Sequence, residues 1–271
     1  MKIPRNRLDM FLQAANSFAD ESRTLAKEII GTNFKVFTKS DKSIVTEADT
    51  KIEVRLRERI RDLFPDHGVI GEEFPPTNPE SSYQWILDPI DGTEEFVNGV
   101  PTYGTIISLE YNTLPIVGLI DHPALNVRVT ATKGGGTFLV DQKVILNDRS
   151  SQDNQLRLGI SKRLNFSRFK DEEVIIFDSI VEKFPNLRIF DSCMAYSLAA
   201  MGSLDVMIDF NVRHWDISAC QLLCEEAGGS FQMLNLRKPK DGSTYYSAVF
   251  GRKSAVSRVL DKLNSLKFSD I

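Results

Sequence analysis

A series of short strand-like segments in the first half of the chain constrains its fold most strongly. Five runs of β-branched or apolar residues follow one another, separated by turn residues: Gln84–Leu87, Thr105–Leu109, Ile116–Ile120, Val127–Ala131 and Thr137–Val140. Because no long helical segment separates these runs, we expect them to form an antiparallel or mixed sheet.

Two helices are expected before these strands. Apolar residues recur at helical spacing from Leu8 to Ile29, which predicts a long amphipathic helix that stops at Gly31. A polar loop, Thr38–Ser43, separates it from a second helix expected from about Thr46 to Leu63. The residues expected on the inner face of the second helix are Ile52, Leu56, Ile60 and Leu63.

The polar stretch Ser150–Gln155 is the best internal boundary, so we expect an N-terminal half, 1–150, and a C-terminal half, 151–271. Strands and helices alternate beyond it. Strands are expected at Leu156–Ser161, Leu187–Phe190 and Val206–Phe210, and helices at Glu172–Phe184, Ala195–Met201 and Ile217–Ala227. The fold class predicted is α+β, with a second half of more α/β character.

Composition excludes several classes of protein. The 271 residues are 42% hydrophobic and 26% charged, as in an ordinary globular protein. The net charge of −4 gives no basic surface for nucleic acid, and no apolar run reaches the length of a membrane span or signal segment. Three cysteines, Cys193, Cys220 and Cys224, form no disulfide framework and are expected to be small buried groups. We therefore expect a cytoplasmic protein that binds neither membrane nor nucleic acid.

The segment Trp85–Thr93 carries the chemistry. An apolar run ends in Asp88 and Asp91, and Gly92 and Thr93 follow at once. Asp-Pro and Asp-Gly are also ordinary turn dipeptides, so the segment taken alone could be a simple turn. A strand that ends in this way can place carboxylate oxygens beside backbone N–H groups, which suits the binding of Mg²⁺ together with a phosphate.

Other motifs accompany this segment in order along the chain. They are Thr46–Asp49, Gly71–Glu73 and Trp215–Ala219. The set resembles the inositol monophosphatase superfamily, whose pattern is G-E-E, then W-[IVL]-[IVL]-D-P-[IL]-D-G-T, then W-D-x-x-[AG]. The resemblance extends from about Lys39 to Gly229. It implies a Mg²⁺-dependent, Li⁺-sensitive phosphatase, a layered α-β-α-β-α sandwich with a smaller mixed C-terminal sheet, and a homodimer.

The resemblance also implies a metal site of two to three Mg²⁺ ions. Its ligands would be Asp49, Glu72, Asp88, the Ile90 carbonyl, Asp91 and Asp216. Two of them also have local structural interpretations, because Asp49 follows Thr46 in a capping-box pattern and Asp216 lies at a helix start. The N-terminal half would thus hold most of the metal and phosphate ligands, and the C-terminal half would add Asp216 and the alcohol pocket.

The expected reaction is hydrolysis of a phosphate monoester by a metal-activated water. Glu72, Asp91 and Thr93 are the predicted catalytic residues, with Glu72 and the Thr93 hydroxyl orienting the water. Gly92 and Thr93, at the start of a short helix, are the predicted phosphate-binding residues. Glu73 is expected to play no more than a supporting role.

The identity of the substrate stays open at this point. Asp209 matches the residue that contacts inositol in the family, which favours inositol monophosphate. The stretches Lys39–Thr46 and Val100–Thr105 resemble the histidinol-phosphatase branch, although Ile44 and Tyr103 replace its Pro and Trp, and Ser192 stands where that branch tends to carry an Asp. Asp209 and Ser192 are the predicted substrate contacts. Histidinol phosphate is therefore the alternative substrate, and a non-catalytic regulator that binds metal or phosphoinositide is a third hypothesis.

Overall fold

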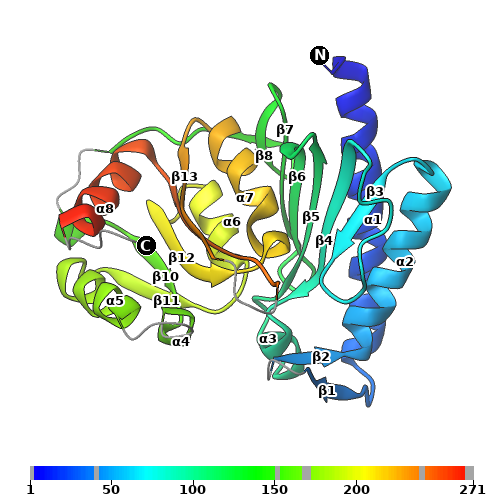
Figure 1. The fold of residues 1–271 in the computed structure, drawn as a ribbon, viewed down its shortest axis with the longest axis horizontal. Coiled ribbons are helices and arrows are strands. Elements are labelled where there is room, and N and C mark those ends of the chain that lie inside the picture. The colour runs from blue at the N-terminus through cyan, green and yellow to red at the C-terminus, as the bar shows by residue number, and fades with distance from the viewer. Residues whose placement is uncertain (1–2, 40–42, 150–152, 167–171, 238–241, 266–271) are drawn as a thin grey trace.

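A computed structural model describes residues 3–39, 43–149, 153–166, 172–237 and 242–265. Two large sheets and three helical layers alternate across the molecule (Figure 1). The order is helices α1 (Arg5–Ile30) and α2 (Glu47–Leu63), a seven-stranded sheet, helices α6 (Met194–Ala200) and α7 (His214–Glu226), a five-stranded sheet, and helices α5 (Glu172–Lys183) and α8 (Lys253–Ser265). The predicted α+β class and α-β-α-β-α layering are confirmed.

The first sheet contains the predicted strand series and is almost wholly antiparallel. Its strands, in spatial order, are β3 (Gly68–Gly71), β4 (Tyr83–Asp91), β5 (Gly104–Tyr111), β6 (Leu114–His122), β7 (Val127–Thr132), β8 (Gly136–Leu139) and β9 (Gln142–Val144). β3 runs parallel to β4, and the other neighbours pair antiparallel; short turns join β5 to β9 in sequence, whereas the connection from β4 to β5 contains helix α3 (Thr93–Val97). The five expected strands are therefore confirmed.

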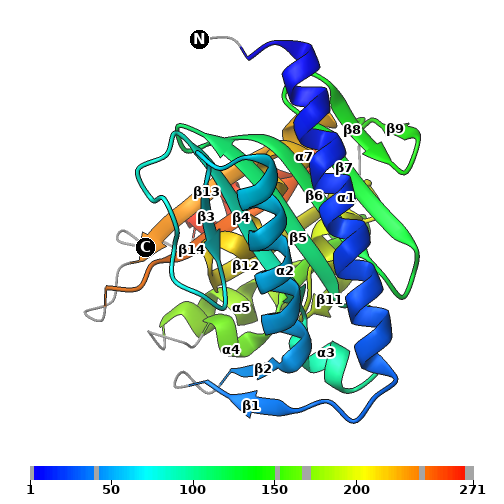
Figure 2. The same cartoon turned by 90° about the vertical axis from the view of Figure 1, so that its right-hand side faces the viewer.

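Helices α1 (Arg5–Ile30) and α2 (Glu47–Leu63) lie side by side across one face of this sheet (Figure 2). Their apolar stripes pack on Trp85 and Leu87 of β4 and form one core. Gly31 caps α1 as expected, and Thr46 and Asp49 form the expected capping box of α2. The expected inner position of Leu63 is wrong, because this residue in the last turn is 47% exposed.

The second sheet is mixed, and its spatial order differs from its order in the chain. Its strands, in spatial order, are β11 (Leu187–Phe190), β10 (Leu158–Ser161), β12 (Val206–Val212), β14 (Tyr245–Gly251) and β13 (Ser230–Arg237). α5 (Glu172–Lys183) and α8 (Lys253–Ser265) contribute apolar side chains to the core on one face of this sheet. A further helix, α4 (Arg163–Phe166), follows β10.

Helices α6 (Met194–Ala200) and α7 (His214–Glu226) fill the space between the two sheets. α7 contacts β4 to β8 on one side and β13 and β14 on the other. Gly118 of β6 allows this close approach, since a Cβ there would lie 3.1 Å from the carbonyl oxygen of Ala219. One helix of the C-terminal half thus packs directly on the N-terminal sheet.

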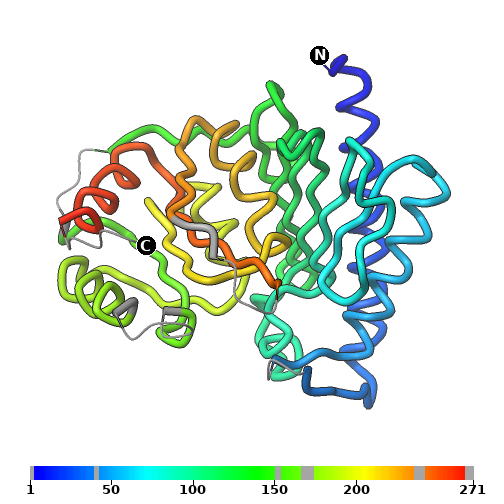
Figure 3. Tube along the Cα trace, in the orientation of Figure 1, coloured from blue at the N-terminus to red at the C-terminus, as the bar shows by residue number. Residues whose placement is uncertain are grey.

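A two-stranded hairpin follows α1. β1 (Val36–Thr38) pairs with β2 (Ile44–Thr46), and β2 leads into α2 beside the short helix α3 (Thr93–Val97) (Figure 3). The expected polar loop Thr38–Ser43 begins at the last residue of β1 and ends directly before β2, and its residues 40–42 lie outside the described part of the chain. The expected boundary Ser150–Gln155 also lies partly outside it, and its last three residues form a 3₁₀ turn.

Candidate active site

A bulge at the end of β4 brings two predicted metal ligands to the same face of the sheet. Asp88 pairs with Ile106 of β5, whereas Asp91 pairs with Gly104, so β4 advances three residues while β5 advances two. Side chains three residues apart on a regular strand point to opposite faces. The surplus residue cancels this offset, so both carboxylates can face α7.

Asp216 completes a compact carboxylate cluster. One carboxylate oxygen from each of Asp88, Asp91 and Asp216 lies within 4.8 Å of the other two. Asp216 belongs to the first turn of α7, where its Oδ2 accepts a hydrogen bond of 2.7 Å from the Arg213 N–H. Asp216 therefore lies both at the start of a helix and close to the end of β4, as predicted.

The electrostatics of the cluster suit a cation. Burial raises the pKa of Asp88 well above its usual range, and burial likewise raises the pKa of Asp91 to about 7, against a hydrogen bond from Cys193. Burial and repulsion from Asp91 raise the pKa of Asp216. Oδ1 of Asp88 is buried and has no hydrogen-bond partner among the described residues. These hard oxygen donors fit a divalent ion such as Mg²⁺, whose charge would offset the repulsion.

Glu72 lies at the same pocket but contacts a lysine. Lys39, just after β1, places its Nζ 2.7 Å from Oε1 of Glu72 and 2.8 Å from Oε1 of Glu73. The Glu73 side chain is only 5% exposed, against 22% for Glu72. Glu73, for which only a supporting role is expected, is thus the more buried of the two glutamates, and burial raises its pKa to about 7.

Asp49 is turned toward its own helix cap. Its Oδ2 accepts hydrogen bonds from the N–H of Thr46 at 2.8 Å and from the Thr46 hydroxyl at 2.5 Å. Its Oδ1 accepts a bond of 3.2 Å from the Thr93 hydroxyl. Asp49 therefore touches a predicted catalytic residue without joining the three-carboxylate cluster, and its role as a ligand stays a prediction.

The predicted phosphate-binding residues, Gly92 and Thr93, follow the cluster directly in the chain. The Thr93 hydroxyl oxygen also lies 3.2 Å from the carbonyl oxygen of Ile90, the predicted neutral ligand, so its single proton can be donated to either this oxygen or Asp49. Gly92 has a left-handed conformation, φ +81°, and a Cβ there would lie 2.8 Å from Cβ of Ser192. Only glycine fits this turn, which begins α3 at the rim of the carboxylate cluster.

A pocket of about 500 Å³ extends from the carboxylates toward the C-terminal sheet. Both predicted substrate residues line it. Asp209 is 2% exposed and accepts hydrogen bonds from the Tyr196 hydroxyl at 2.5 Å and from the Phe210 N–H at 2.8 Å. Burial raises its pKa to about 6. Ser192 donates to the Thr102 carbonyl at 3.0 Å.

Several residues of the pocket were not anticipated from the sequence. Lys162 donates to Asp191 at 2.7 Å and lies 3.9 Å from Glu94, and all three line the wall beyond Ser192. The N–H of Cys193 donates to Oδ1 of Asp91. Lys39 could have been anticipated, because it begins the stretch Lys39–Thr46 that resembles the histidinol-phosphatase branch. Nothing in the local sequence identifies a pair such as Lys162 and Asp191, which are 29 residues apart.

The three cysteines are buried and form no disulfide, as expected. The three histidines are all engaged in hydrogen bonds. His67 accepts from Trp85 at 3.1 Å, His122 bonds Ser197 at 2.8 Å, and His214 bonds Glu110 at 2.8 Å. These hydrogen bonds connect distant segments of the chain, and none of the three histidines is among the described residues that line the pocket.

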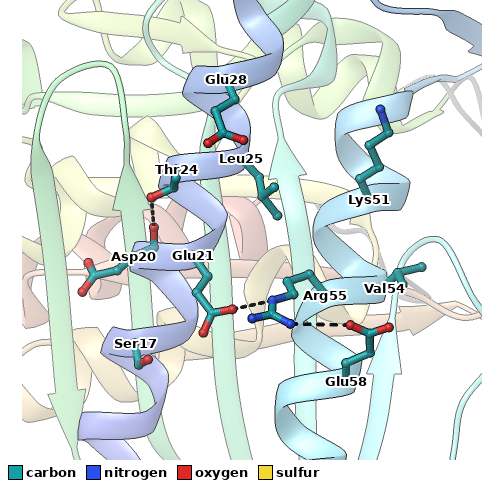
Figure 4. A pocket seen from close by; sticks show the side chains of 10 residues that line it. All are labelled: Ser17, Asp20, Glu21, Thr24, Leu25, Glu28, Lys51, Val54, Arg55 and Glu58. Carbon is teal, nitrogen blue, oxygen red and sulfur yellow. Dashed lines mark hydrogen bonds and ion pairs between the residues drawn. The ribbon is translucent and has the colours of Figure 1, made fainter.

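A second groove, of about 600 Å³, lies on the outer helical layer between α1 and α2 (Figure 4). Arg55 of α2 forms an ion pair with Glu21 of α1 across it at 2.7 Å, and a second one with Glu58 of its own helix at 3.7 Å. The pair with Glu21 joins the two helices, and the groove contains none of the predicted site residues. In the part of the chain that the structure covers, no helix combines the length and apolar character needed to cross a bilayer.

Comparison with known proteins agrees with this geometry. The chain is 32% identical over 226 residues to a histidinol-phosphatase of Chlorobaculum parvum, covering 80% of this chain and 83% of that protein. It is 30% identical over 260 residues to a histidinol-phosphatase of Mycobacterium tuberculosis, covering 94% and 98%. The inositol monophosphatase structure from Anabaena shares the fold, with a TM-score of 0.81, 22% identity and coverage of 96% and 97%. The model of the inositol monophosphatase family matches residues 7–263, and this chain belongs to that family.

Proposed function

We propose that the protein is a Mg²⁺-dependent phosphomonoesterase that hydrolyses a small phosphorylated alcohol. The observation that carries the proposal is the cluster of Asp88, Asp91 and Asp216, which opens into a pocket beside the start of α3. All-oxygen donors with a buried, unpartnered carboxylate atom are suited to a hard divalent ion.

Each residue of the site has a distinct task in this proposal. The three clustered carboxylates hold the metal, with Glu72, Asp49 and the Ile90 carbonyl as further ligands. Bound Mg²⁺ would activate a water molecule and stabilise the departing oxygen. The Thr93 hydroxyl and Glu72 orient the attacking water. Backbone N–H groups at Gly92 and Thr93 bind the phosphate oxygens, and the Gly92 turn lets the phosphate approach the backbone closely.

The alcohol end of the pocket favours a cationic leaving group. Besides the proposed metal ligands, four carboxylates line the pocket, whereas Lys162 is the single cationic side chain among its described lining residues; the four are Glu94, Glu95, Asp191 and Asp209. Oε2 of Glu95 is buried and has no partner within the described chain. A protonated amine on the alcohol would balance this charge, so we place histidinol phosphate first, in keeping with the names of the two relatives.

Inositol monophosphate is the second candidate. Asp209 supports it, because a buried carboxylate at the alcohol end can accept hydrogen bonds from substrate hydroxyl groups as well as from an amine. We further propose that the protein is a homodimer inhibited by Li⁺, as its family membership suggests. Light scattering of the purified chain and a lithium titration of its activity test these two points.

The decisive experiment measures phosphate release from histidinol phosphate, inositol 1-phosphate, fructose 1,6-bisphosphate and phosphoadenosine phosphate. We expect release that requires Mg²⁺, stops with chelator and is fastest with histidinol phosphate. Faster release from inositol 1-phosphate would reverse the order of the two substrates. No release from any of them, with Mg²⁺ binding intact, would favour the non-catalytic regulator.

A further inference from the structure

The bulge in β4 requires support from its neighbours, because it interrupts the hydrogen-bond ladder next to the carboxylates. Pro89 lies within the bulge and has no N–H to give to the ladder, and its carbonyl lies in the interior. A buried carbonyl without a donor is costly, so this group needs a partner from outside the ladder.

Thr105 provides that partner. It lies between Gly104 and Ile106 on β5, which pair with the two ends of the bulge, so it is the one residue opposite the irregular segment. Its hydroxyl donates to the Pro89 carbonyl at 2.8 Å, and Thr105 is only 2% exposed.

A second hydroxyl, from helix α1, extends this hydrogen bond into a relay. Ser22 of α1 is fully buried, and its Oγ lies 2.6 Å from Oγ1 of Thr105. Since a carbonyl can only accept, Thr105 uses its proton on Pro89, and Ser22 must donate to Thr105. The relay from Ser22 through Thr105 to Pro89 therefore ties α1 to the bulge from the face opposite α7.

We propose that Thr105 is a positioning residue for metal binding, because it holds the bulge that brings Asp88 and Asp91 onto one face. The inference rests on the proposed metal-dependent function and goes beyond it. Thr105 is not among the proposed ligands or the described residues that line the pocket, and its hydroxyl acts through the Pro89 carbonyl on Asp88 and Asp91. Groups that orient metal ligands commonly affect affinity by 10- to 100-fold.

The test compares Mg²⁺ binding to full-length variants without substrate, by calorimetric titration and by the rise in melting temperature with Mg²⁺. Thr105→Val keeps the shape of the side chain and removes the hydroxyl, so we expect about tenfold weaker Mg²⁺ binding. Thr105→Ser restores the hydroxyl and should bind within about twofold of the unmodified chain, on the same reasoning. Thr105→Ala gives the same comparison if valine prevents folding.

A matched control separates positioning from general stability. Ser108, on the same strand, is fully buried and donates to the Val117 carbonyl at 3.1 Å, away from the bulge. Ser108→Ala removes a hydrogen bond of the same kind, so it should lower the metal-free melting temperature while leaving Mg²⁺ affinity unchanged. Ser22→Ala leaves the bond from Thr105 to Pro89 intact and should also retain normal affinity.

The outcomes distinguish this inference from the function beneath it. Thr105→Val that binds Mg²⁺ as well as Ser108→Ala does, in a background where the unmodified chain binds, overturns the positioning role alone. Failure of the unmodified chain to bind Mg²⁺ overturns the proposed function and this inference together.

Discussion

Three carboxylates that repel one another have a cost in stability that a bound cation would remove. Asp88, Asp91 and Asp216 share a small, poorly hydrated volume, and the pKa of each carboxyl group is raised. Such a cluster is expected at a binding site, where the side chains suit the bound ligand rather than the stability of the metal-free protein.

Asp91→Asn tests this view at the cluster itself. The amide keeps the volume of Asp91 and can still accept the hydrogen bond from the Cys193 N–H. Turnover should fall at least about 100-fold, as expected when a metal site is disturbed, while the metal-free melting temperature stays the same or rises. Asp62→Asn, at a side chain that is 59% exposed, is the control and should change neither value. Near-normal turnover of Asp91→Asn at saturating Mg²⁺ would contradict a ligand role.

Asp209→Asn tests the alcohol end of the pocket. The amide keeps the size of the side chain but removes a charge from the wall, so binding of an amine-bearing substrate should weaken more than binding of inositol 1-phosphate. A site that loses a required polar partner can discriminate by roughly 10⁴-fold at the extreme, so a change of KM ratio on the order of tenfold is a conservative expectation. Steady-state kinetics on the substrate panel measures it. An unchanged ranking would remove Asp209 from the substrate contacts.

A stacked aromatic cluster anchors α1 and the end of α2 to β3 and β4. The His67 ring stacks on Tyr83 at 4.7 Å and on Phe64 at 4.8 Å, and its Nδ1 accepts the bond from the Trp85 indole. That bond requires an unprotonated Nδ1. Burial, with repulsion from Arg7, lowers the pKa of His67 to about 4, and Asp66 only partly opposes this shift.

His67 should contribute an acid-sensitive part of the stability. As the pH falls below about 6.5, His67 gains a proton in the unfolded chain but stays neutral in the native protein until about pH 4, so its contribution to the free energy of unfolding decreases across this range. Between pH 7 and pH 5 the loss from this group is roughly 2 kcal/mol. The buried carboxyl groups with raised pKa values, such as Glu73 and Asp91, act in the opposite direction, so the contribution of His67 is the difference in pH dependence between the unmodified chain and His67→Gln in denaturant titrations at the two pH values. Equal pH dependence of the two proteins would contradict this role of His67.

The sequence predicted those elements whose signals are local. The capping pattern at Thr46, the stop at Gly31 and the apolar runs of β5 to β8 depend on neighbouring residues, and the structure contains all of them. The bulge in β4 and the β1–β2 hairpin depend on pairing between strands. Such pairing leaves little trace in either strand taken alone, so both features were missed.

At the scale of the whole molecule, the two halves share one helical layer. α6 and α7 come from the C-terminal half, yet their apolar side chains pack with Ile106, Ile120 and Val129 of the N-terminal sheet. The site residues likewise divide into those with a local signal and those without one. Family motifs identified the carboxylates, whereas contacts between distant segments, such as that of Lys39 with Glu72, could be found only from the fold.

This shared layer predicts that the halves do not fold separately. A fragment of residues 1–150 would expose the face of its sheet that α6 and α7 cover. The stabilisation lost with this buried area would exceed the small free energy of unfolding of such a fragment. We expect it to lack a cooperative thermal transition and to bind a hydrophobic dye, as circular dichroism and fluorescence can show. A cooperative transition in the fragment would instead support two independent domains that meet at residue 150.

Side chains along β4 alternate between the two faces of the sheet, and the bulge shifts this alternation by one residue between Asp88 and Asp91. The residues that follow, including the turn at Gly92, keep the shifted orientation. A one-residue insertion between Pro89 and Ile90 would reverse the shift, turn Asp91 away from Asp216 and abolish Mg²⁺ binding in a calorimetric titration. The same insertion between Asn112 and Thr113, at a hairpin tip with positive φ angles, does not change the orientation of Asp91 and should be tolerated. The chain therefore tolerates no change of length at the bulge in β4, whereas the turn at the far end of the neighbouring strand β5 can accept one.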